Sequence, residues 1–341
     1  MIYRAKAPLR ISFCGGGTDV SPYAEERGGC VLSATIDKYA WVSVRPRPDG
    51  IELASLDYGL RRTYPQGRIP LDGELDLPIA ALNHFHESLG GLPSGVEVTV
   101  HCDAPPGSGL GSSSTVVATL VGGIGRWLGA RLTPYAIAET TYEIERLEVR
   151  LSGGRQDQYA AVFGGFNFIE FTRDQTIVNA LRIPRDTMNE LEYHLLLVYT
   201  GATRTSARIV DTQMERYRRG APEAVGALDE LKRLAIELKN LLLLEKLDDF
   251  GRGLHAAWEV KKRLAEAITN ETIDGLYAAA IEAGAIGGKI LGAGGGGHLL
   301  FYCPIERKSS VAAAVAARGG RIVPFAFEER GLQTWQVPEP A

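Results

Sequence analysis

A glycine-rich segment between a strand pattern and a buried helix constrains the fold of this chain most. The segment APPGSGLGSSS covers residues 104–114 and follows VEVTVHC, whose alternating apolar residues predict a strand over 96–102. Residues 112–128 are apolar on nearly every face, which is typical of a helix buried inside a domain. A glycine-rich loop that runs into a helix N-terminus offers free backbone N–H groups and the positive end of the helix dipole. It therefore predicts an anion site, with phosphate as the expected ligand.

The predicted anion site comprises the end of this loop and the first turn of the helix. Its members are Pro106, Gly107, Ser108, Gly109, Leu110, Gly111, Ser112, Ser113 and Ser114. The serine hydroxyls can bond phosphate oxygens, reach a Mg²⁺ ion, or simply cap the helix. The loop lacks the terminal lysine of a P-loop, and Ser112 stands where a dinucleotide-binding fingerprint needs its third glycine. Both of those phosphate-binding motifs therefore fit poorly.

Two further glycine runs stand beside residues that can bind a ligand. The first, SFCGGGTDV at 12–20, ends a strand pattern and brings Thr18 and Asp19 directly after three glycines. An aspartate in such a turn either stabilises the turn or accepts the hydroxyl groups of a substrate, and both interpretations remain open. The second run, GAGGGG at 292–297, leads into an apolar strand pattern. Such runs indicate backbone that closely approaches another part of the molecule or a ligand.

Acidic residues near the middle of the chain are candidates for catalysis and metal binding. Asp157 follows a glycine-rich turn, and Arg155 stands close to it in the sequence. A carboxylate beside a cation keeps its charge and can orient or deprotonate an attacking hydroxyl, as phosphoryl transfer requires. On the preceding helix pattern, Glu148 falls within the apolar stripe and Glu145 lies at its edge. Helix geometry does not decide which of these glutamates is the metal ligand. For each of them the alternative interpretation is a surface acid paired with an arginine.

Composition favours a globular protein of two domains. The 341 residues, 45% of them hydrophobic, exceed a single domain of roughly 100–200 residues. The formal net charge of −4 argues against nucleic acid as the main partner. The four cysteines have no metal-ligand spacing, and no apolar run reaches the roughly 18 residues of a membrane span. We therefore expect a soluble cytoplasmic protein without zinc, disulfides, nucleic-acid partners or membrane contacts.

The order of strand and helix patterns indicates an α+β or mixed α/β fold. Strands are expected at 7–13, 31–44, 96–102, within 164–183, at 193–200 and at 298–303. Helices are expected from residue 79, at 112–128, 133–151, 202–219, 221–247, 250–267, 273–284 and 307–318. We divide the chain into an N-terminal domain, 1–185, and a C-terminal domain, 186–341.

Three motifs together resemble those of one enzyme family. PPGSGLGSSS, RISFCGGGTDV and KILGAGGGGHLLF are similar, in order and spacing, to the motifs of the GHMP small-molecule kinases, which include galactokinase, homoserine kinase and mevalonate kinase. The resemblance covers nearly the whole chain, from about residue 3 to residue 330. Within the family, APLRISFCGGGTDVSPY and YEIERLEVRLSGGRQDQYAAVFGGFN look most like the D-glycero-D-manno-heptose 7-phosphate kinases.

The resemblance implies both a fold and a set of residue roles. The fold would combine an N-terminal domain like that of ribosomal protein S5 with a C-terminal ferredoxin-like domain, and the loop would hold ATP. By position, Ser113 and Glu145 would hold Mg²⁺, with Ser112 as the neighbouring candidate, and Asp157 would be the catalytic carboxylate. The 292–297 run would pack against the phosphate-binding loop. Substrate-binding roles are assigned to Gly17, Thr18, Asp19, Arg155, Gly294 and Gly295.

The chain departs from family patterns in ways that bear on the substrate. Gly16–Gly17 replaces the Glu-His pair of galactokinase, which counts against galactose as the acceptor. His298 stands where many relatives carry an apolar or small residue, and packing is its expected role. A phosphorylated acceptor needs a cationic pocket, although each candidate arginine also fits a surface or structural role. The candidates are Arg155, Arg204 and Arg208.

The residues and the resemblance together predict an ATP- and Mg²⁺-dependent kinase. It would phosphorylate the anomeric hydroxyl of D-glycero-D-manno-heptose 7-phosphate to the 1,7-bisphosphate, for a nucleotide-activated heptose of surface polysaccharide. A family kinase for another sugar, such as fucose or a hexose, is the first alternative, and a non-catalytic sensor is the second. ATP and a sugar phosphate are the expected partners; the oligomeric state stays open, with a homodimer as one option.

Overall fold

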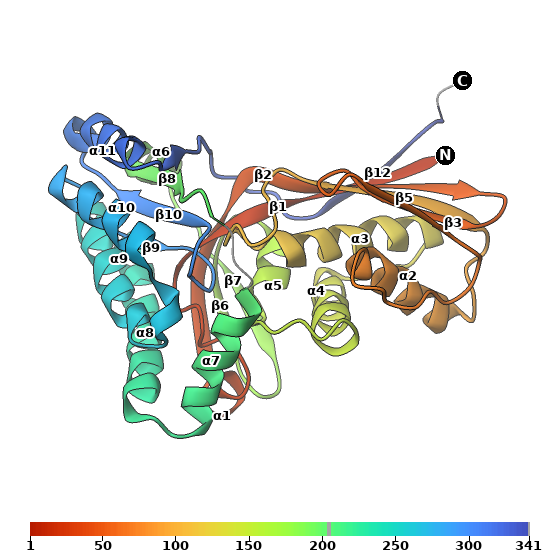
Figure 1. The fold of residues 1–341 in the computed structure, drawn as a ribbon, viewed down its shortest axis with the longest axis horizontal. Coiled ribbons are helices and arrows are strands. Elements are labelled where there is room, and N and C mark those ends of the chain that lie inside the picture. Colours follow the sequence, from red (N-terminus) through yellow and green to blue (C-terminus); the bar gives the residue numbers. More distant parts are fainter. Residues whose placement is uncertain (203–205, 340–341) are drawn as a thin grey trace.

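Two sheets lie side by side in the molecule, each with helices packed against it (Figure 1). This computed structural model describes residues 1–202 and 206–339. Arg204, one of the three arginines considered for the acceptor phosphate, therefore lies outside the described residues. The larger sheet comes mainly from the first half of the chain and the smaller sheet from the second half.

The larger sheet has eight strands in the order β12-β1-β2-β5-β3-β4, with β6 paired to β2 and β7 paired to β6. Its members are β1 (Ile2–Cys14), β2 (Gly29–Arg47), β3 (Ile51–Ser55), β4 (Leu60–Tyr64), β5 (Gly95–Cys102), β6 (Phe166–Phe171), β7 (Thr176–Ala180) and β12 (Gln333–Val337). The strands expected in the first hundred residues are confirmed. The alternating pattern gives way to continuous burial in the second half of β1, where Leu9, Ile11 and Phe13 join the apolar core of the C-terminal helices. The end of β1 therefore lies between the two parts of the molecule.

Four helices pack beneath the larger sheet in the view of Figure 1. They are α2 (Asp76–Leu89), α3 (Ser112–Leu128), α4 (Pro134–Glu143) and α5 (Gln156–Phe163). Helix α3 has the predicted bounds, and its residues Val117, Val121 and Ile124 are fully buried. The predicted cap of α4 is also present, because the Thr133 side chain accepts a hydrogen bond of 3.2 Å from the backbone N–H of Ala136.

The helix expected over 133–151 is shorter than its sequence pattern suggested. After α4 the backbone widens into a π-helical turn, Ile144–Glu148. There the N–H of Val149 donates to the carbonyl of Ile144, and the N–H of Leu151 donates to the carbonyl of Glu145. A turn with this wider spacing reorients the side chains on it, and such turns are frequent at functional sites.

The smaller sheet is antiparallel, in the order β11-β8-β10-β9. Its strands are β8 (Leu195–Tyr199), β9 (Gly287–Ile290), β10 (His298–Tyr302) and β11 (Arg321–Ile322). The helices α8 (Pro222–Leu243), α9 (Leu247–Lys262) and α10 (Glu271–Glu282) lie in the connection from β8 to β9, and α11 (Ile305–Ala317) connects β10 to β11. This order is the βαββαβ pattern of a ferredoxin-like unit with additional helices, as predicted.

Short elements account for the remaining differences from the sequence analysis. The structure adds α1 (Tyr23–Arg27), α6 (Arg185–His194) and a 3₁₀ turn, Glu266–Ile268, while α7 (Ser206–Arg218) corresponds to the helix expected over 202–219. Helix α6 includes Tyr193 and His194, which were expected to begin a strand. Strands β9 and β12 were not anticipated, and β12 belongs to the larger sheet although the division at 185/186 assigned it to the C-terminal domain.

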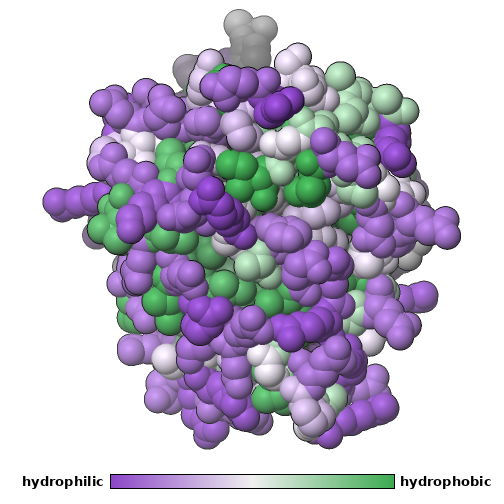
Figure 2. All heavy atoms as spheres, turned by 90° about the vertical axis from the view of Figure 1, so that its left-hand side faces the viewer, coloured by the Kyte–Doolittle hydropathy of each residue, from purple (hydrophilic) through white to green (hydrophobic). Residues whose placement is uncertain are grey.

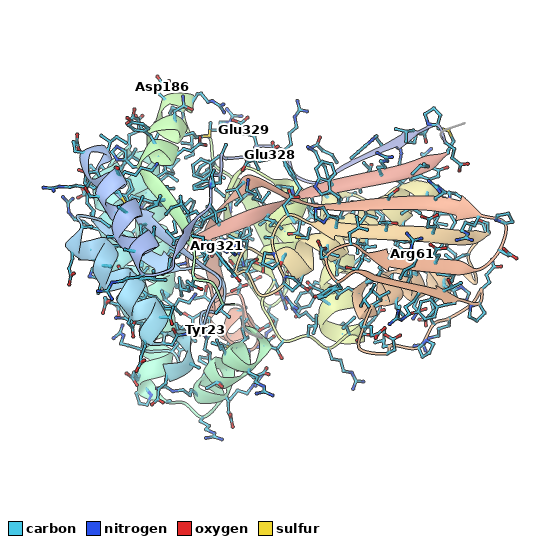
Figure 3. The ribbon with its side chains drawn as sticks, turned by 45° about the horizontal axis from the view of Figure 1, so that its top comes forward. Tyr23, Arg61, Asp186, Arg321, Glu328 and Glu329 are labelled. Atoms are coloured by element: carbon cyan, nitrogen blue, oxygen red, sulfur yellow. The ribbon has the colours of Figure 1, made fainter. Side chains whose placement is uncertain are left out.

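The connection from β11 to β12 returns the chain from the smaller sheet to the larger one, and contacts of two glutamates hold it in place. Figure 3 shows Glu328 and Glu329 near the junction of the two parts. The Tyr39 hydroxyl donates to the carboxylate of Glu328 at 2.5 Å, and Thr35 donates to its backbone carbonyl at 2.6 Å. Arg185 of α6 pairs with Glu329 at 3.1 Å. These contacts bind the segment to β2 and to α6 before β12 pairs with β1.

Polar side chains cover most of the face formed by the C-terminal helices, with smaller apolar groups between them (Figure 2). Exposed apolar residues on these helices include Ile236, Leu243 and Ile281. In the part of the chain that the structure describes, every helix is too short or too polar to cross a membrane.

The four cysteines are unpaired and buried, which gives a prediction about thiol reactivity. Burial raises the pKa of the Cys14 thiol to about 11 and those of Cys30, Cys102 and Cys303 to about 12. Because the thiolate is the reactive form, we expect Ellman's reagent to label the native protein only slowly at pH 8 and to titrate all four thiols after unfolding. A rapid reaction of the native protein would contradict this arrangement.

Candidate active site

A cavity of about 1080 Å³ lies where the two parts of the molecule meet. Residues of β1, the loop before α3, the π-helical turn, α5 and α7 line it, together with Lys261 of α9 and Gly292. A cavity of this size can hold two small molecules at once. The glycine runs predicted to approach a ligand or another backbone segment therefore meet at one site.

The loop before α3 forms a cradle of backbone N–H groups on the wall of the cavity. Gly107, Gly109 and Gly111 have φ angles of 73°, 79° and 77°, in the left-handed region that favours glycine. Gly111 is the N-cap residue of α3, and no side chain caps the helix there. The serines that follow are therefore not N-caps, and the N-terminus of α3 stays available to an anion.

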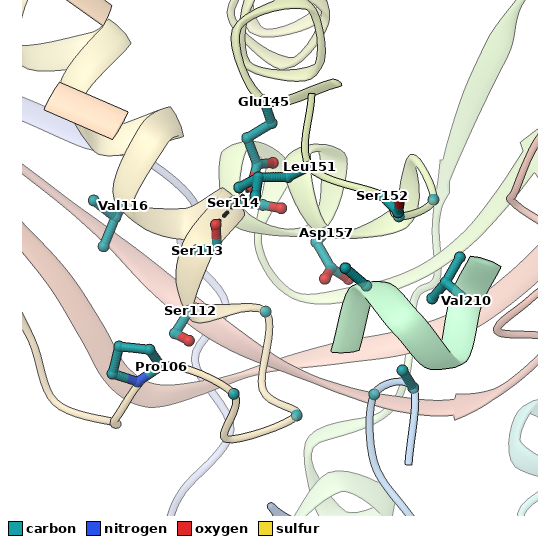
Figure 4. Close-up of a pocket in the computed structure, with 18 of the residues that line it drawn as sticks. Pro106, Ser112, Ser113, Ser114, Val116, Glu145, Leu151, Ser152, Asp157 and Val210 are labelled. Atoms are coloured by element: carbon teal, nitrogen blue, oxygen red, sulfur yellow. Dashed lines mark hydrogen bonds between the residues drawn. The ribbon is translucent and has the colours of Figure 1, made fainter. Parts of the chain in front are cut away.

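Glu145 lies opposite this helix terminus and binds its second serine. The carboxylate is fully buried and accepts from the Ser113 hydroxyl at 2.7 Å (Figure 4). It also accepts from the Gln158 amide at 2.7 Å. The π-helical turn directs Glu145 toward α3, whereas Glu148 lies at the surface against His84 at 2.9 Å. The structure thus separates two acids that helix geometry could not distinguish.

The third glycine run packs against the cradle from the C-terminal part, as expected. A Cβ added to Gly109 would lie 2.7 Å from the carbonyl oxygen of Leu291, so only glycine fits this contact. His298 Nδ1 lies 2.7 Å from the carbonyl oxygen of Ser108, and burial lowers the pKa of this histidine. The predicted packing role of His298 is confirmed: a neutral, buried imidazole donates from Nδ1 and joins β10 to the loop.

Asp157 lies in the first turn of α5, beside the cradle. A Cβ added to Gly111 would lie 3.3 Å from the Cγ atom of Asp157. Arg10 of β1 donates from Nε to Asp157 Oδ1 at 2.8 Å, its Nη2 forms an ion pair with the same oxygen at 2.7 Å, and its Nη1 donates to the Gly109 carbonyl at 2.6 Å. Since both of these Arg10 contacts end on Oδ1, Oδ2 has no partner among the described residues and remains available to a ligand.

The cation beside Asp157 is therefore Arg10, and the expectation that Arg155 supplies it is wrong. Arg155 pairs with Glu25 at 2.6 Å, and its guanidinium lies over the ring of Tyr142 at 5.3 Å. Residues two apart in a helical turn point in different directions, so closeness in sequence does not bring Arg155 to Asp157. The Arg155 side chain lies outside the cavity lining.

Asp19 lies on the cavity wall and binds α5 directly. Its Oδ2 accepts from the Gln156 backbone N–H and side-chain amide, both at 3.1 Å, and its Oδ1 accepts from the Gly17 N–H at 2.9 Å. Burial raises the pKa of Asp19 above its usual range, and the charge of Asp157 adds to this effect. A Cβ on Gly154 would lie 1.9 Å from Oδ2, so the glycine turn before α5 makes room for this carboxylate. Asp19 is therefore more than a turn residue.

Family models match both parts of the chain. The model of the GHMP kinases N-terminal domain matches residues 76–165, and that of the GHMP kinases C-terminal domain matches residues 225–321. The D-glycero-alpha-D-manno-heptose 7-phosphate kinase of Campylobacter jejuni is 34% identical over 337 residues, which are 98% of this chain and 99% of that protein. The chain belongs to the GHMP kinase family. The predicted enzyme class, an ATP-dependent kinase, is thereby confirmed.

Solved structures agree with this membership. A D-glycero-D-manno-heptose 1-phosphate kinase from Bacteroides thetaiotaomicron superposes with a TM-score of 0.84 at 34% identity, over 99% of this chain and 100% of that one. A protein described as a putative sugar kinase of Campylobacter jejuni gives a TM-score of 0.81 at 33% identity, over 98% of both chains. The predicted two-domain GHMP kinase fold is confirmed by these likenesses and by the strand order of both sheets.

The residues predicted for the GHMP kinase site divide into those that line the cavity and those that support it. The lining members are Pro106, Gly107, Gly109, Gly111, Ser112, Ser113, Ser114, Glu145, Asp157, Gly17 and Asp19. Arg208, exposed on α7, also lines the cavity. Ser108 and Leu110 are buried beneath the loop, and Thr18 is buried with its hydroxyl donating to the carbonyls of Gly15 and Cys30.

Gly294 and Gly295 lie beside the site rather than in the lining. The Gly295 N–H donates to the carbonyl of Ile268 at 2.8 Å, and a Cβ on Gly294 would lie 2.7 Å from that same oxygen. The cavity is lined instead by Gly292 and Ala293, at the start of the run. The run thus reaches the cavity at its first two residues, while the next two fix its conformation.

Sequence reasoning missed Arg10, Gln158 and Lys261. Arg10 and Lys261 line the cavity, and Gln158 binds the carboxylate of Glu145. Each is a polar residue within an otherwise apolar stretch: Arg10 interrupts a buried strand, and Lys261 follows the buried Ala257 and Trp258 at helical spacing. A charged residue at a position that the apolar pattern of a strand or helix predicts to be buried is the sequence signal that could have identified Arg10 and Lys261.

Proposed function

We propose that this GHMP kinase transfers the γ-phosphoryl group of ATP to the anomeric hydroxyl of D-glycero-D-manno-heptose 7-phosphate. The product is the 1,7-bisphosphate, a precursor of nucleotide-activated heptose for surface polysaccharide. The observation that carries the proposal is the similarity to a heptose 7-phosphate kinase along essentially the whole chain. The coarser statement, that the enzyme is a sugar kinase, follows from the same likeness and from the heptose kinase structure.

The geometry around Asp157 supports catalysis by positioning. In the proposed step, Oδ2 of Asp157 accepts the proton of the acceptor hydroxyl while that oxygen attacks the γ-phosphorus, and the bridging oxygen leaves with ADP. Arg10 holds Oδ1 by a hydrogen bond from Nε and an ion pair from Nη2, which fixes the orientation of the carboxylate. The cradle of N–H groups at the start of α3 stabilises the charge of the phosphates in the transition state.

The donor set near Glu145 fits a magnesium ion held partly by substrate. Groups of three or more acidic, histidine or cysteine side chains that could hold a metal are absent from the described part of the chain. Mg²⁺ commonly uses one or two protein oxygens together with phosphates and water. We propose that the fully buried Glu145 carboxylate and the Ser113 hydroxyl supply those protein oxygens. The bound ion would neutralise phosphate charge during transfer.

The cavity lining contains groups that suit each of the two substrates. Leu75, Pro78, Val100 and Tyr58 are lining residues that suit a nucleotide base. Asp19 and Gly17 also line the cavity, and we assign them to the sugar. ATP as a substrate and four unpaired thiols favour the cytoplasm as the location.

An acceptor panel tests the proposed substrate. ADP release would be measured with ATP and Mg²⁺ on D-glycero-D-manno-heptose 7-phosphate, mannose 6-phosphate, mannose, fucose, galactose and mevalonate. We expect kcat/KM for the heptose phosphate to exceed every other value by at least about tenfold, because a site built for a charged group discriminates strongly against acceptors that lack it. Preference for an unphosphorylated sugar would contradict the heptose assignment and favour another kinase of the family.

A further inference from the structure

Lys261 is a buried lysine of the cavity wall that the proposed chemistry leaves unused. It lies at the end of α9, and the residue is only 5% exposed. Its Nζ donates to the carbonyl oxygen of Gly292, at the start of the third glycine run. Both residues line the same cavity as Asp19 and Asp157.

The charge of Lys261 has no carboxylate partner within ion-pair distance among the described residues. Arg10, the other buried cation of the wall, is paired with Asp157. Burial lowers the pKa of Lys261 well below its usual range, and the nearby charges of Lys289 and Arg10 lower it further. Desolvated cations are normally paired or bound to several acceptors, and one carbonyl is an incomplete set for an ammonium group with three donors. An anion in the cavity would complete it.

Lys289 provides a comparison within the same protein. It is also buried, and its Nζ donates to a single carbonyl oxygen, that of Ser12, at 2.6 Å. Burial lowers its pKa to about 8. Lys289, on β9, does not belong to the cavity lining, whereas Lys261 does. Lys289 therefore binds one backbone carbonyl without lining the cavity, whereas Lys261 binds one carbonyl and also lines the cavity.

The contacts of Gly292 place Lys261 near the transferring end of the site. A Cβ added to Gly292 would lie 2.7 Å from the Cα atom of Gly109. The Gly109 carbonyl in turn accepts from Arg10, which holds Asp157. Lys261 is thus connected, through two adjoining backbone segments, to the catalytic carboxylate and the phosphate cradle.

We propose that the Lys261 ammonium binds a phosphate oxygen in this cavity. The proposal rests on the proposed function and deepens it, since that reaction brings two phosphates to the site: the γ-phosphate of the nucleotide and the phosphate that the sugar already carries. Both present the same chemistry to a lysine, a charged oxygen that accepts from N–H groups. Binding of either would supply the missing counter-charge.

Ligand binding by three variants at two lysines tests the proposal. Lys261→Met removes the charge with little change in side-chain length, Lys261→Arg retains the charge, and Lys289→Met is the matched control for loss of a buried lysine. Affinities would be measured by calorimetry for ADP, a non-hydrolysable ATP analogue and heptose 7-phosphate, with thermal unfolding to show that each variant is folded. We expect Lys261→Met to lose at least tenfold in one affinity, Lys261→Arg to recover part of it, and Lys289→Met to stay within about twofold of the unaltered enzyme.

The pattern of loss distinguishes the two phosphates. A loss for the ATP analogue without a loss for ADP assigns Lys261 to the γ-phosphate. A loss for heptose 7-phosphate with both nucleotides unaffected assigns it to the phosphate of the sugar. A folded Lys261→Met enzyme with all three affinities unchanged overturns the proposal. The nucleotide affinities are measured without an acceptor sugar. An error in the proposed acceptor would therefore not be mistaken for failure of the Lys261 proposal.

A measurement on the unaltered enzyme covers the case in which Lys261→Met does not fold. Acetylation of Lys261 by a small anhydride would be followed by mass spectrometry with and without saturating ATP analogue or heptose 7-phosphate. We expect one of these ligands to slow labelling of Lys261 at least fivefold, with labelling of Lys289 as the internal reference. Equal labelling of Lys261 under all conditions would overturn the proposal.

Discussion

Replacing Asp157 with asparagine is expected to lower kcat by about 10²–10⁴-fold, the usual contribution of a positioned general base. Asparagine keeps an oxygen for the hydrogen bond from Arg10 Nε but presents an amide where Oδ2 now has no partner among the described residues. The amide cannot take the proton of the acceptor hydroxyl. Because Asp157 lies beside the phosphate cradle but is not part of it, the affinity for ADP should stay within about threefold.

Single-turnover kinetics and nucleotide binding would be measured on the same preparation of the variant. Asp174→Asn is a suitable control, since it removes one carboxylate from the exposed connection between β6 and β7. We expect that control to retain full activity. An Asp157→Asn enzyme that turns over normally, or that fails only because it no longer binds ATP, would refute the role assigned to this carboxylate.

Replacing Glu145 with glutamine is expected to lower kcat/KM by about 10²-fold or more at ordinary Mg²⁺ concentrations. Glutamine preserves the shape of the side chain and can still accept from the Ser113 hydroxyl, so the fold should survive. It removes the buried negative charge that we assign to the magnesium site. Raising the Mg²⁺ concentration should therefore recover part of the lost activity.

The measurement is the Mg²⁺ dependence of the rate for the Glu145→Gln and Glu148→Gln enzymes. Glu148 is a close control because it lies on the same π-helical turn but pairs with His84 at the surface. We expect the Glu148→Gln enzyme to follow the unaltered Mg²⁺ curve. Identical Mg²⁺ curves for all three enzymes would contradict the assignment of Glu145.

The local features of the site could be predicted from the sequence because each is encoded in a short segment. The bounds of α3 follow from its unbroken apolar pattern and from the glycine loop before it. The conformation of that loop follows from glycines at positions with positive φ. Asp19 and Asp157 could be singled out because each adjoins a glycine turn.

Contacts between distant segments could not be predicted in the same way. Arg10 and Asp157 are separated by most of the N-terminal part, and only the packing of β1 against α5 brings them together. Strand β12 alternates between half-buried and exposed residues, and its partner β1 lies at the other end of the chain. The orientation of Glu145 depends on a π-helical turn, a change in backbone spacing that a regular helical pattern does not reveal. Tertiary packing therefore decided the partner of each charged group.

The central claim is that this GHMP kinase phosphorylates a heptose phosphate at its anomeric position. Phosphorus NMR of the product formed from D-glycero-D-manno-heptose 7-phosphate, ATP and Mg²⁺ tests it most directly. We predict a new phosphate resonance coupled to the anomeric proton, with the resonance of the 7-phosphate retained and one ADP formed for each new ester. A new ester on any other carbon, or ADP formation without a new sugar phosphate, would contradict the claim.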